Sequence, residues 1–362
     1  MSGIQITTFG HTSFSREGQP LTWTAVSARD LLQYLLSFPD GRTRAQIIDG
    51  LWNQDDTAQT NNHFRVTLHR LRGTLGAHDT VEEDSGRYHL SPDVWRHTDI
   101  YAFHRSLIEA ERTGLEGSIP ALHRAVLYYQ GPFLTDVAAE WVACSRSEHQ
   151  AAFTQAQLDL GAAQCVRGAC QEAVTCLTQA LRLDPYLDEA VHERFMACLS
   201  VVQGTSAALE HYRRYMNLLQ REFSALPALP TWQLAQRLQS GASVCPRVEG
   251  QAPLYRAADQ SPLAPSSHCH GNLRRLITED LMRQSISPTS SLSFVERTAA
   301  GVKVVWNGTP RLLSFPLAAT RLRSGSGPVE EVELWSSLGD DLVIQLSRVW
   351  NGPGAWQIQR WC

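Results

Sequence analysis

Hydrophobic residues in the first part of the chain recur with helical spacing in three successive segments. We expect the first helix to begin at Ser27 as its N-cap, and the second to run over residues 43–52 with Thr43 as its cap. The third helix is expected over residues 60–75. It ends before Gly76, a residue suited to the left-handed conformation at a helix C-terminus.

Short alternating segments flank these helices. Residues 3–24 alternate and break at Gly10 and at residues 16–20, which predicts short antiparallel strands. Residues 80–90 alternate around Ser85-Gly86, which predicts a hairpin. The order of strands, three helices and a hairpin is that of a winged helix-turn-helix, a fold whose third helix enters the major groove of DNA.

The third helix has one apolar and one cationic face. The apolar stripe consists of Phe64, Leu68, Leu71 and Leu75, and the opposite face of Asn62, Arg65, His69 and Arg72. Residues 61–76 hold three arginines and two histidines but no acidic residue. An ordinary amphipathic surface helix can show the same division, so the neighbouring elements must decide between the two interpretations.

Two short motifs decide in favour of a DNA-binding domain. Leu71, Arg72 and Leu75 match the L-R-x-x-L pattern that ends the recognition helix of OmpR-type regulators. Gly86, Arg87 and Tyr88 match the signature of the wing in that family. Residues 1–95 therefore resemble an OmpR-type winged-helix domain, and the resemblance implies that residues 60–75 are the recognition helix and residues 80–90 the wing.

The resemblance also implies a role for individual side chains. Base edges are expected to be contacted by Asn62, Arg65, Val66 and His69. Asparagine can pair with adenine, arginine with guanine O6 and N7, and valine can pack on a thymine methyl group. Phosphates are expected to be contacted by Arg72, Arg87, Arg42 and Arg44. Arg42 and Arg44 lie near the N-terminus of the second helix, and a plain solvated charge is an equal alternative for both.

Acidic residues flank the cationic helix on both sides. Glu82, Glu83 and Asp84 place acid on the wing, where they would repel phosphate unless they point away from DNA or pair with Arg87. Asp55 and Asp56 lie in the polar loop over residues 53–60. OmpR-type activators often touch RNA polymerase at this loop, so the resemblance makes both aspartates candidate polymerase contacts, with ordinary solvated side chains as the alternative.

From residue 94 to residue 240 the pattern is helical almost throughout. Two segments of this region repeat each other with a period of 35 residues, measured from Ala173 to Ala208. That period is close to the tetratricopeptide length of about 34 residues, so we expect stacked helical hairpins. Pro185, between the two segments, is expected to open the next helix.

Several motifs of this region resemble those of the bacterial transcriptional activator domain. They are the turn over Tyr128–Leu134, the group Trp141, Val142 and Arg146, the group Asp184, Pro185 and Glu189, and the group Ala208, Leu209 and Tyr212. With the winged helix ahead of them, residues 1–240 resemble a SARP-type transcriptional activator. The resemblance implies a homodimer on repeated operator sites that helps to recruit RNA polymerase. Trp141, Tyr212 and Met196 themselves are interpreted as packing residues.

The remaining residues form a different region. Residues 241–271 are rich in Ser, Pro, Ala and Gly without a period, which indicates a linker. A short helix is expected over residues 273–284, followed by alternating segments with Asn-Gly turns at 307–308 and 351–352. Five tryptophans could line an aromatic pocket, although core positions are the alternative: Trp306, Trp335, Trp350, Trp356 and Trp361. Ligand sensing, partner binding and capping of the repeats stay open as roles for this region.

Composition limits these interpretations. A net charge of −4 argues against an indiscriminate binder of polyanions, so any nucleic-acid site must be local. The eight cysteines are expected to be reduced, because those of the helical region fall in helical patterns as small apolar residues. His268-Cys269-His270 lacks the spacing of a metal clamp, so we expect neither a metal nor a cofactor.

The common catalytic motifs are absent, and no apolar run reaches the length of a membrane span. The N-terminal residues lack the features of a signal peptide, so we expect a cytoplasmic protein that is not an enzyme and does not contact a membrane. The expected fold class is multidomain and mainly α. It comprises a winged helix-turn-helix (1–95), a TPR-like helical domain (96–240), a linker (241–271) and a small β-rich (α+β) domain (272–362).

The sequence therefore predicts a transcriptional activator that binds double-stranded DNA through residues 60–75 and 80–90 and contacts RNA polymerase. The alternative is a TPR-type interaction scaffold without DNA binding, which the acidic wing and the negative net charge favour. The lack of acidic residues in 61–76 opposes that alternative, because a helix that had lost its DNA partner would have no reason to stay purely cationic.

Overall fold

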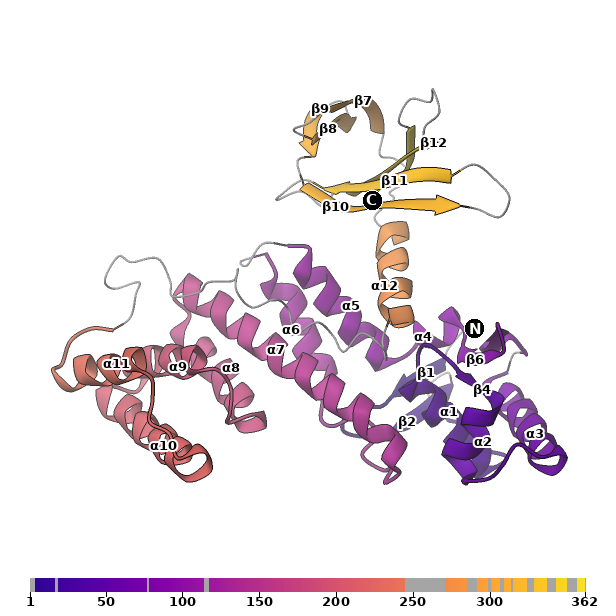
Figure 1. Cartoon of the computed structure of the whole chain (residues 1–362), viewed down its shortest axis with the longest axis horizontal. Coiled ribbons are helices and arrows are strands. Elements are labelled where there is room, and N and C mark those ends of the chain that lie inside the picture. The colour runs from indigo at the N-terminus through magenta and orange to yellow at the C-terminus, as the bar shows by residue number, and fades with distance from the viewer. Residues whose placement is uncertain are drawn as a thin grey trace. The chain divides into compact units, whose positions relative to one another are not determined.

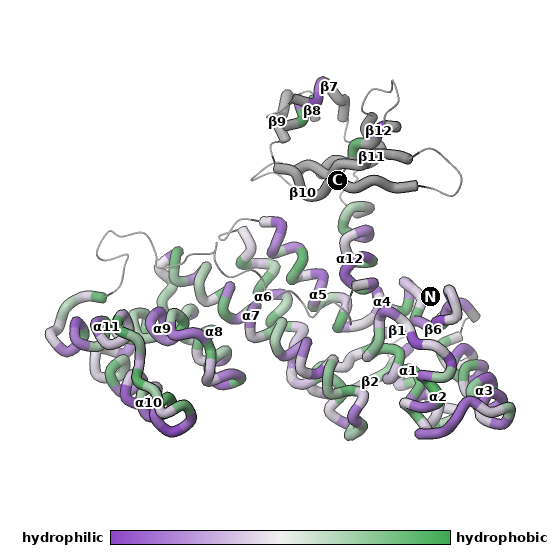
Figure 2. The backbone as a smooth tube through the Cα atoms, viewed as in Figure 1, coloured by the Kyte–Doolittle hydropathy of each residue, from purple (hydrophilic) through white to green (hydrophobic). Residues whose placement is uncertain are grey.

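The computed structural model (Figure 1) describes residues 4–16, 19–76, 78–113, 117–244 and 271–284, together with seven strands between residues 292 and 361. The chain divides into two compact units, Met1–Arg274 and Arg275–Cys362. In the first unit, hydrophobic and hydrophilic stretches alternate along the helices (Figure 2), as expected of helices that bury one face. The predicted fold class, mainly helical with a strand-rich C-terminal part, is confirmed.

The first unit begins with a small antiparallel sheet and three helices. The strands, in spatial order, are β1 (Ile4–Thr7), β2 (Ser13–Arg16) and β3 (Gln19–Pro20). The helices are α1 (Val26–Ser37), α2 (Arg44–Trp52) and α3 (Ala58–Leu75). Fully buried apolar side chains from all three helices form a common core, among them Leu31, Ile47 and Phe64. Burial of these side chains is the main force that holds the helices together.

The start of α1 differs from the predicted cap at Ser27. The helix begins at Val26, with Ala25 at the N-cap position and no side-chain capping bond. The Thr67 hydroxyl of α3 lies 3.4 Å from the Ser27 hydroxyl and donates to it. The Ser27 side chain therefore links α1 to α3 and does not cap its own helix.

A second three-stranded sheet forms the wing. Its spatial order is β4-β6-β5, with β4 (Arg42–Thr43), β5 (Val81–Asp84) and β6 (Arg87–Leu90). Ser85 and Gly86 join β5 to β6 with φ angles of 52° and 77°. A type I′ turn needs positive φ at both central residues, and its twist matches that of the strands. The predicted hairpin is confirmed.

The first strand of the unit also joins the helical region that follows the wing. That region starts with α4 (Pro92–Trp95), α5 (Asp99–Glu111), α6 (Ile119–Tyr128) and α7 (Ala143–Arg167). The Ile6 N–H donates to the His97 carbonyl at 2.9 Å. The Asp99 carboxylate accepts from the Thr8 N–H at 2.7 Å and from the Phe9 N–H at 2.9 Å. The winged helix is thus fastened to the helical region through β1.

Two helical pairs complete the first unit: α8 (Cys170–Leu183), α9 (Glu189–Val202), α10 (Thr205–Phe223) and α11 (Leu229–Gln239). Ala173 and Ala208, aligned by the sequence repeat, are both fully buried. The prediction that Pro185 opens the next helix is wrong. The Asp184 side chain accepts from the Tyr186 N–H and forms a separate turn before α9. The helix begins at Glu189, where the Asp188 side chain caps it by accepting from the Ala190 N–H.

Strands dominate the second unit. Helix α12 (Gly271–Gln284) spans its boundary and begins two residues before the predicted start. One antiparallel sheet holds β7 (Leu292–Thr298), β8 (Gly301–Trp306) and β9 (Thr309–Leu313). The other, also antiparallel, holds β10 (Phe315–Arg323), β11 (Val329–Ser336), β12 (Val343–Val349) and β13 (Gln357–Trp361).

Several predictions for the C-terminal part concern residues outside those that the structure describes. These are residues 245–270 of the predicted linker, the His268-Cys269-His270 stretch and both Asn-Gly turns. The side chains of the five tryptophans considered for a pocket also lie outside the described part. Among the residues that are described, no helix is long and apolar enough to cross a membrane.

Candidate nucleic-acid interface

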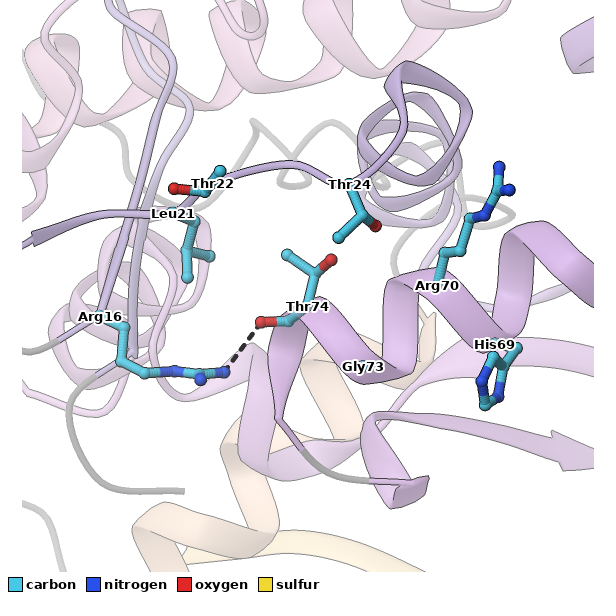
Figure 3. A pocket seen from close by; sticks show the side chains of 8 residues that line it. All are labelled: Arg16, Leu21, Thr22, Thr24, His69, Arg70, Gly73 and Thr74. Atoms are coloured by element: carbon cyan, nitrogen blue, oxygen red, sulfur yellow. Dashed lines mark hydrogen bonds between the residues drawn. The ribbon is translucent and has the colours of Figure 1, made fainter.

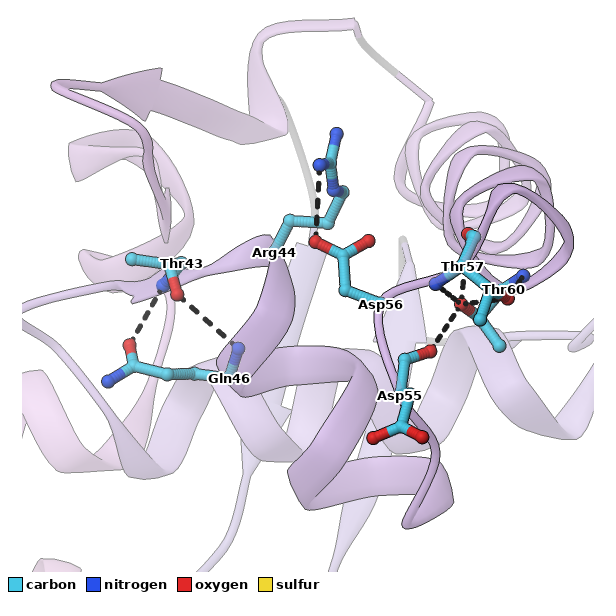
Figure 4. A network of polar contacts seen from close by, with 7 residues as sticks. All are labelled: Thr43, Arg44, Gln46, Asp55, Asp56, Thr57 and Thr60. Carbon is cyan, nitrogen blue, oxygen red and sulfur yellow. Dashed lines mark hydrogen bonds and ion pairs between the residues drawn. The ribbon is translucent and has the colours of Figure 1, made fainter.

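Reciprocal capping bonds determine where α2 and α3 begin (Figure 4). At α2, the Thr43 hydroxyl accepts from the Gln46 N–H at 3.3 Å, and the Gln46 side-chain oxygen accepts from the Thr43 N–H at 3.0 Å. At α3, Thr57 and Thr60 exchange equivalent bonds of 3.3 Å and 2.9 Å. Two orphan donors at each helix start are thereby satisfied. Because Thr57 is the cap, α3 begins at Ala58, two residues before the predicted start.

The other end of α3 is also closed by specific contacts. Gly76 has a φ of 78°, and its N–H donates to the Arg72 carbonyl at 2.9 Å. Arg16 of β2 donates from Nη2 to the Thr74 carbonyl at 2.9 Å (Figure 3). A cation at this position satisfies a carbonyl that the helix cannot pair and opposes the negative end of the helix dipole.

The face of α3 that points away from the core is the candidate base-reading surface. Phe64, Leu71 and Leu75 are fully buried or nearly so, as the apolar stripe predicts. All four predicted base contacts are exposed: Asn62, Arg65, Val66 and His69. Val66 is 38% exposed although it is apolar, so it is available to pack on a thymine methyl group.

Two arginines next to α2 have partners within the chain. Arg44 Nη2 lies 3.3 Å from Asp56 Oδ2, and the two side chains point toward each other (Figure 4). The Arg42 guanidinium carbon lies 3.9 Å from the centroid of the Phe38 ring, a cation–π contact. The structure thus brings together Arg44, a predicted phosphate contact, and Asp56, a predicted polymerase contact. Asp55, the other polymerase candidate, is exposed in the same turn.

The two remaining predicted phosphate contacts differ in exposure. Arg87 is exposed on the wing, and its Nη1 donates to the Gly41 carbonyl at 3.0 Å. Arg72 is half-buried, and its Nη2 donates to the Val81 carbonyl at 2.6 Å, which ties α3 to β5. For both residues the contact with DNA stays a prediction. The structure adds that Arg72 already connects the candidate recognition helix to the wing.

The acidic residues of the wing lie on β5, all of them exposed. Asp84 stands opposite Arg87 in the strand register, and Glu83 opposite Tyr88. Among the described contacts, Arg87 donates to the Gly41 carbonyl and not to a wing carboxylate. Burial raises the pKa of Tyr88, and its hydrogen bond to Glu83 raises that pKa further. Glu83 is therefore directed at Tyr88.

A shallow groove lies along one side of α3, between that helix and the segment before α1 (Figure 3). It is lined by Arg16, Leu21, Thr22, Thr24, His69, Arg70, Gly73 and Thr74. Arg70 is exposed, and the sequence analysis did not assign it a role. Its place one helical turn after Val66 is the signal that could have found it, because residues four apart share a helix face.

The helical region that carries this winged helix matches a known family. Residues 93–239 match the family model described as the bacterial transcriptional activator domain. The chain carries a bacterial transcriptional activator domain. The activator domain takes in α5 through α11, and its function class is transcription regulation. A winged helix followed by an activator domain is the arrangement of SARP-type activators, so the family resemblance is confirmed.

The motif residues of the activator domain pack as interpreted. Met196 is fully buried, and Trp141 makes an edge contact with Tyr34 at a ring-centroid distance of 5.2 Å. Arg146 donates to the carbonyl groups of Phe133, Leu134 and Val137 at 2.9, 2.6 and 3.0 Å. One guanidinium therefore holds both the end of the Tyr128–Leu134 turn and the loop that follows it.

Among solved structures, the chain is similar along its whole length to Mycobacterium tuberculosis EmbR in complex with a low-affinity phosphopeptide. The TM-score is 0.55 at 15% sequence identity, and the match covers 99% of this chain and 98% of that chain. At this identity the likeness concerns the fold. No curated protein matches the chain.

Proposed function

We propose that this protein is a sequence-specific transcriptional activator that places α3 in the major groove of DNA and its β5–β6 wing on the flanking backbone. The exposed face of α3 carries the proposal. It presents Asn62, Arg65, Val66 and His69 together, on a helix without an acidic residue. Each well-placed base contact contributes about 1–3 kcal/mol of discrimination between base pairs. The proposed activity is binding, and it requires neither a cofactor nor a catalytic residue.

Phosphate contacts in this proposal come from arginines around α3. Arg87 is exposed on the wing and Arg70 on the groove side of α3, so the two flank the base-reading face. Arg42, Arg44 and Arg72 lie close by, each engaged with a partner of its own chain. Contacts of this kind fix the position of the protein on DNA and make binding depend on salt, without reading the base sequence.

RNA polymerase is the second proposed partner. Asp55 and Asp56 lie in the turn between α2 and α3, beside the DNA surface. The Asp56 carboxylate is paired with Arg44. The backbone carbonyl of Asp55 accepts from the Thr60 hydroxyl, and the Asp55 side chain is exposed. Asp55 is therefore the better placed of the two. Two copies of the chain, bound as a homodimer on a repeated operator, would present two such turns.

A binding experiment tests the DNA-binding proposal. The full-length protein is incubated with a pool of genomic fragments, the enriched fragment is identified, and its affinity is measured over a salt titration. Arg65→Ala should lower the affinity for the preferred site by about tenfold and relax the preference at one base pair. Arg87→Ala should weaken binding to all sequences and reduce the salt slope by about one. Arg213→Ala, an exposed arginine of α10, is the control with the same charge change.

The outcome separates the proposal from its alternative. The activator is supported by enrichment of discrete fragments, together with relaxed base preference for Arg65→Ala and a reduced salt slope for Arg87→Ala. Failure to enrich any fragment, with and without added cell extract, would instead favour a TPR-type interaction scaffold. For the polymerase contact, Asp55→Asn should bind DNA normally and lose activation in transcription with purified polymerase. The mass of the complex on a two-site operator tests the homodimer.

A further inference from the structure

Two thiols from different helices of the activator domain meet in its interior. Cys165 lies in the last turn of α7, and Cys198 lies in α9, 33 positions further along the chain. Cys198 Sγ and Cys165 Sγ are 3.6 Å apart, so the two sulfur atoms are in direct contact with nothing between them. Neither residue takes part in the proposed DNA surface.

The two thiols differ in exposure. Cys198 is 1% exposed and belongs to the apolar core formed by α8, α9, α10 and α11. Cys165 is partly exposed and packs against the edge of that core. A small oxidant from solvent therefore reaches Cys165 first, and the buried Cys198 thiol lies in contact with it. This arrangement is that of a reactive thiol with a resolving partner.

We propose that Cys165 and Cys198 form a reversible disulfide when hydrogen peroxide oxidises the protein. The Cys165 thiol loses its proton and its sulfur attacks one oxygen of hydrogen peroxide, so the O–O bond breaks; the departing hydroxide takes up that proton as one water, and Cys165 becomes a sulfenic acid. Cys198 sulfur then attacks Cys165 sulfur, the S–O bond breaks, and the hydroxide leaves as a second water with the proton of the Cys198 thiol. Overall, two thiols and one hydrogen peroxide give one disulfide and two waters.

The movement that this reaction needs is small. A disulfide has an S–S length of about 2.05 Å, so the sulfurs must approach by about 1.5 Å. Cys165 is two residues from the end of α7, and the following Gly168 has a φ of 82°. A helix end carries fewer packing and hydrogen-bond constraints than a helix centre, so the last turn of α7 can supply this shift.

The bond would link α7 directly to α9. Helix α8 lies between α7 and α9 in the chain and buries Ala173, Val174 and Leu177 in the same core as Cys198. A bridge from α7 to α9 closes a loop around α8 and lowers the entropy of the unfolded chain. Oxidation would thus stabilise the helical pairs of the activator domain against unfolding.

Peptide mapping of the full-length protein tests the proposal. The protein is treated with hydrogen peroxide under native conditions, alkylated and digested without reductant. A linked pair of peptides that contain Cys165 and Cys198, two hydrogen atoms lighter than the sum, is expected, and dithiothreitol should remove it. The melting temperature should rise by about 5 °C on oxidation and return on reduction. Cys165→Ser and Cys198→Ala should abolish both effects.

The other cysteines supply the controls. Cys144→Ser removes an exposed thiol of the same helix and should leave the linked pair and the temperature shift unchanged. In Cys198→Ala, where alanine suits a buried site, a sulfenic acid on Cys165 should accumulate and react with dimedone. The proposal is overturned if the linked peptides come from other cysteines or from two chains. It is equally overturned if Cys165 in the intact protein proceeds to sulfinic acid without any link to Cys198.

Discussion

Arg44 Nη2 lies 3.3 Å from Asp56 Oδ2, an ion pair between the first residue of α2 and the turn before α3. Considered separately, the two residues are a candidate phosphate contact and a candidate polymerase contact. In the folded chain each neutralises the other beside the cationic face of α3. Their side chains are 40% and 32% exposed, so the pair contributes little to stability and can open when DNA approaches.

Asp56→Asn should strengthen DNA binding. Removing the carboxylate leaves the Arg44 guanidinium without its ionic partner, so a DNA phosphate no longer competes with Asp56 for it. We expect the affinity to rise a few-fold at low salt and the salt slope to steepen by about one. Fluorescence anisotropy with a labelled operator over a salt series measures both. Asp55→Asn makes the same charge change in the same turn and is the control. It should leave the salt slope unchanged, because the Asp55 contact with Thr60 uses the backbone carbonyl and not the carboxylate. Equal slopes for the two variants would mean that Arg44 does not touch DNA.

Arg70→Met and Arg72→Met should separate binding from stability on a single helix. The Arg72 guanidinium donates to the Val81 carbonyl at 2.6 Å, and methionine keeps most of the apolar stem while losing this bond. We expect Arg72→Met to lower the free energy of unfolding by about 1 kcal/mol, since the site is half-buried. Arg70 is exposed, so Arg70→Met should keep the wild-type melting temperature and weaken DNA binding. Thermal denaturation and fluorescence anisotropy on both variants check this. If Arg70→Met lowered the melting temperature and Arg72→Met only weakened DNA binding, then Arg70 would be the stabilising residue and Arg72 the DNA contact.

Asp99→Ala should loosen the joint between the winged helix and the activator domain. The carboxylate accepts from the Thr8 N–H, the Phe9 N–H and the Thr8 hydroxyl at 2.7, 2.9 and 2.8 Å, all of them buried. Alanine leaves three donors without an acceptor, which should cost about 2–4 kcal/mol.

Asp99→Asn provides the matched control for this joint. Its side-chain oxygen can accept from both N–H groups while its amide donates to the Thr8 hydroxyl. Burial raises the pKa of Asp99, so the charge itself is disfavoured and a neutral side chain should be tolerated. Melting temperatures should therefore rank wild type close to Asp99→Asn and well above Asp99→Ala. A loss as large for asparagine as for alanine would mean that the charge, not the acceptor, is needed.

His192 and His211 should make the activator domain sensitive to mild acid. His192 Nδ1 lies 3.1 Å from His211 Nε2 between α9 and α10, and burial lowers the pKa of each imidazole from 6.5 to about 4. Nearby Glu189, Asp184 and Asp188 oppose this by raising the pKa of His192, whereas His192 and Arg214 lower the pKa of His211 further; burial is the largest cause for both. The unfolded chain thus binds protons at a higher pH than the folded chain. The contribution of the two imidazoles to stability is full above pH 6.5, declines as the pH falls and is lost toward pH 4.

His211→Gln tests this pH dependence. Melting temperatures measured from pH 7 to pH 5, above the range in which most carboxylates titrate, should fall for the wild type. The decline should be about half as steep for the variant, because one of the two titrating imidazoles is gone. If the melting temperature fell equally steeply with pH in the wild type and in His211→Gln, the pH dependence would come from other groups.

The elements of the winged helix could be predicted from the sequence because their signals are local. Thr43 and Gly76 cap the helices that they were expected to cap, and Ser85-Gly86 forms the predicted turn. Each of these residues acts on its own backbone within a few positions. Two predictions were wrong: a cap at Ser27 and a helix start at Pro185. At both positions another contact replaces the one that the local sequence favours. A hydroxyl from α3 engages Ser27, and Asp188 offers a better cap than Pro185.

The sequence by itself determined the order of the elements, the two faces of α3 and the membership of residues 93–239 in the activator domain family. The hydrophobic period and the capping residues depend on residues that are close along the chain, so the sequence is enough to identify them. Only the tertiary structure decided which charges are already paired, as for Arg44 with Asp56, and which thiols touch, as for Cys165 with Cys198. Such pairs depend on how helices pack, and packing joins residues whose distance along the chain carries no signal.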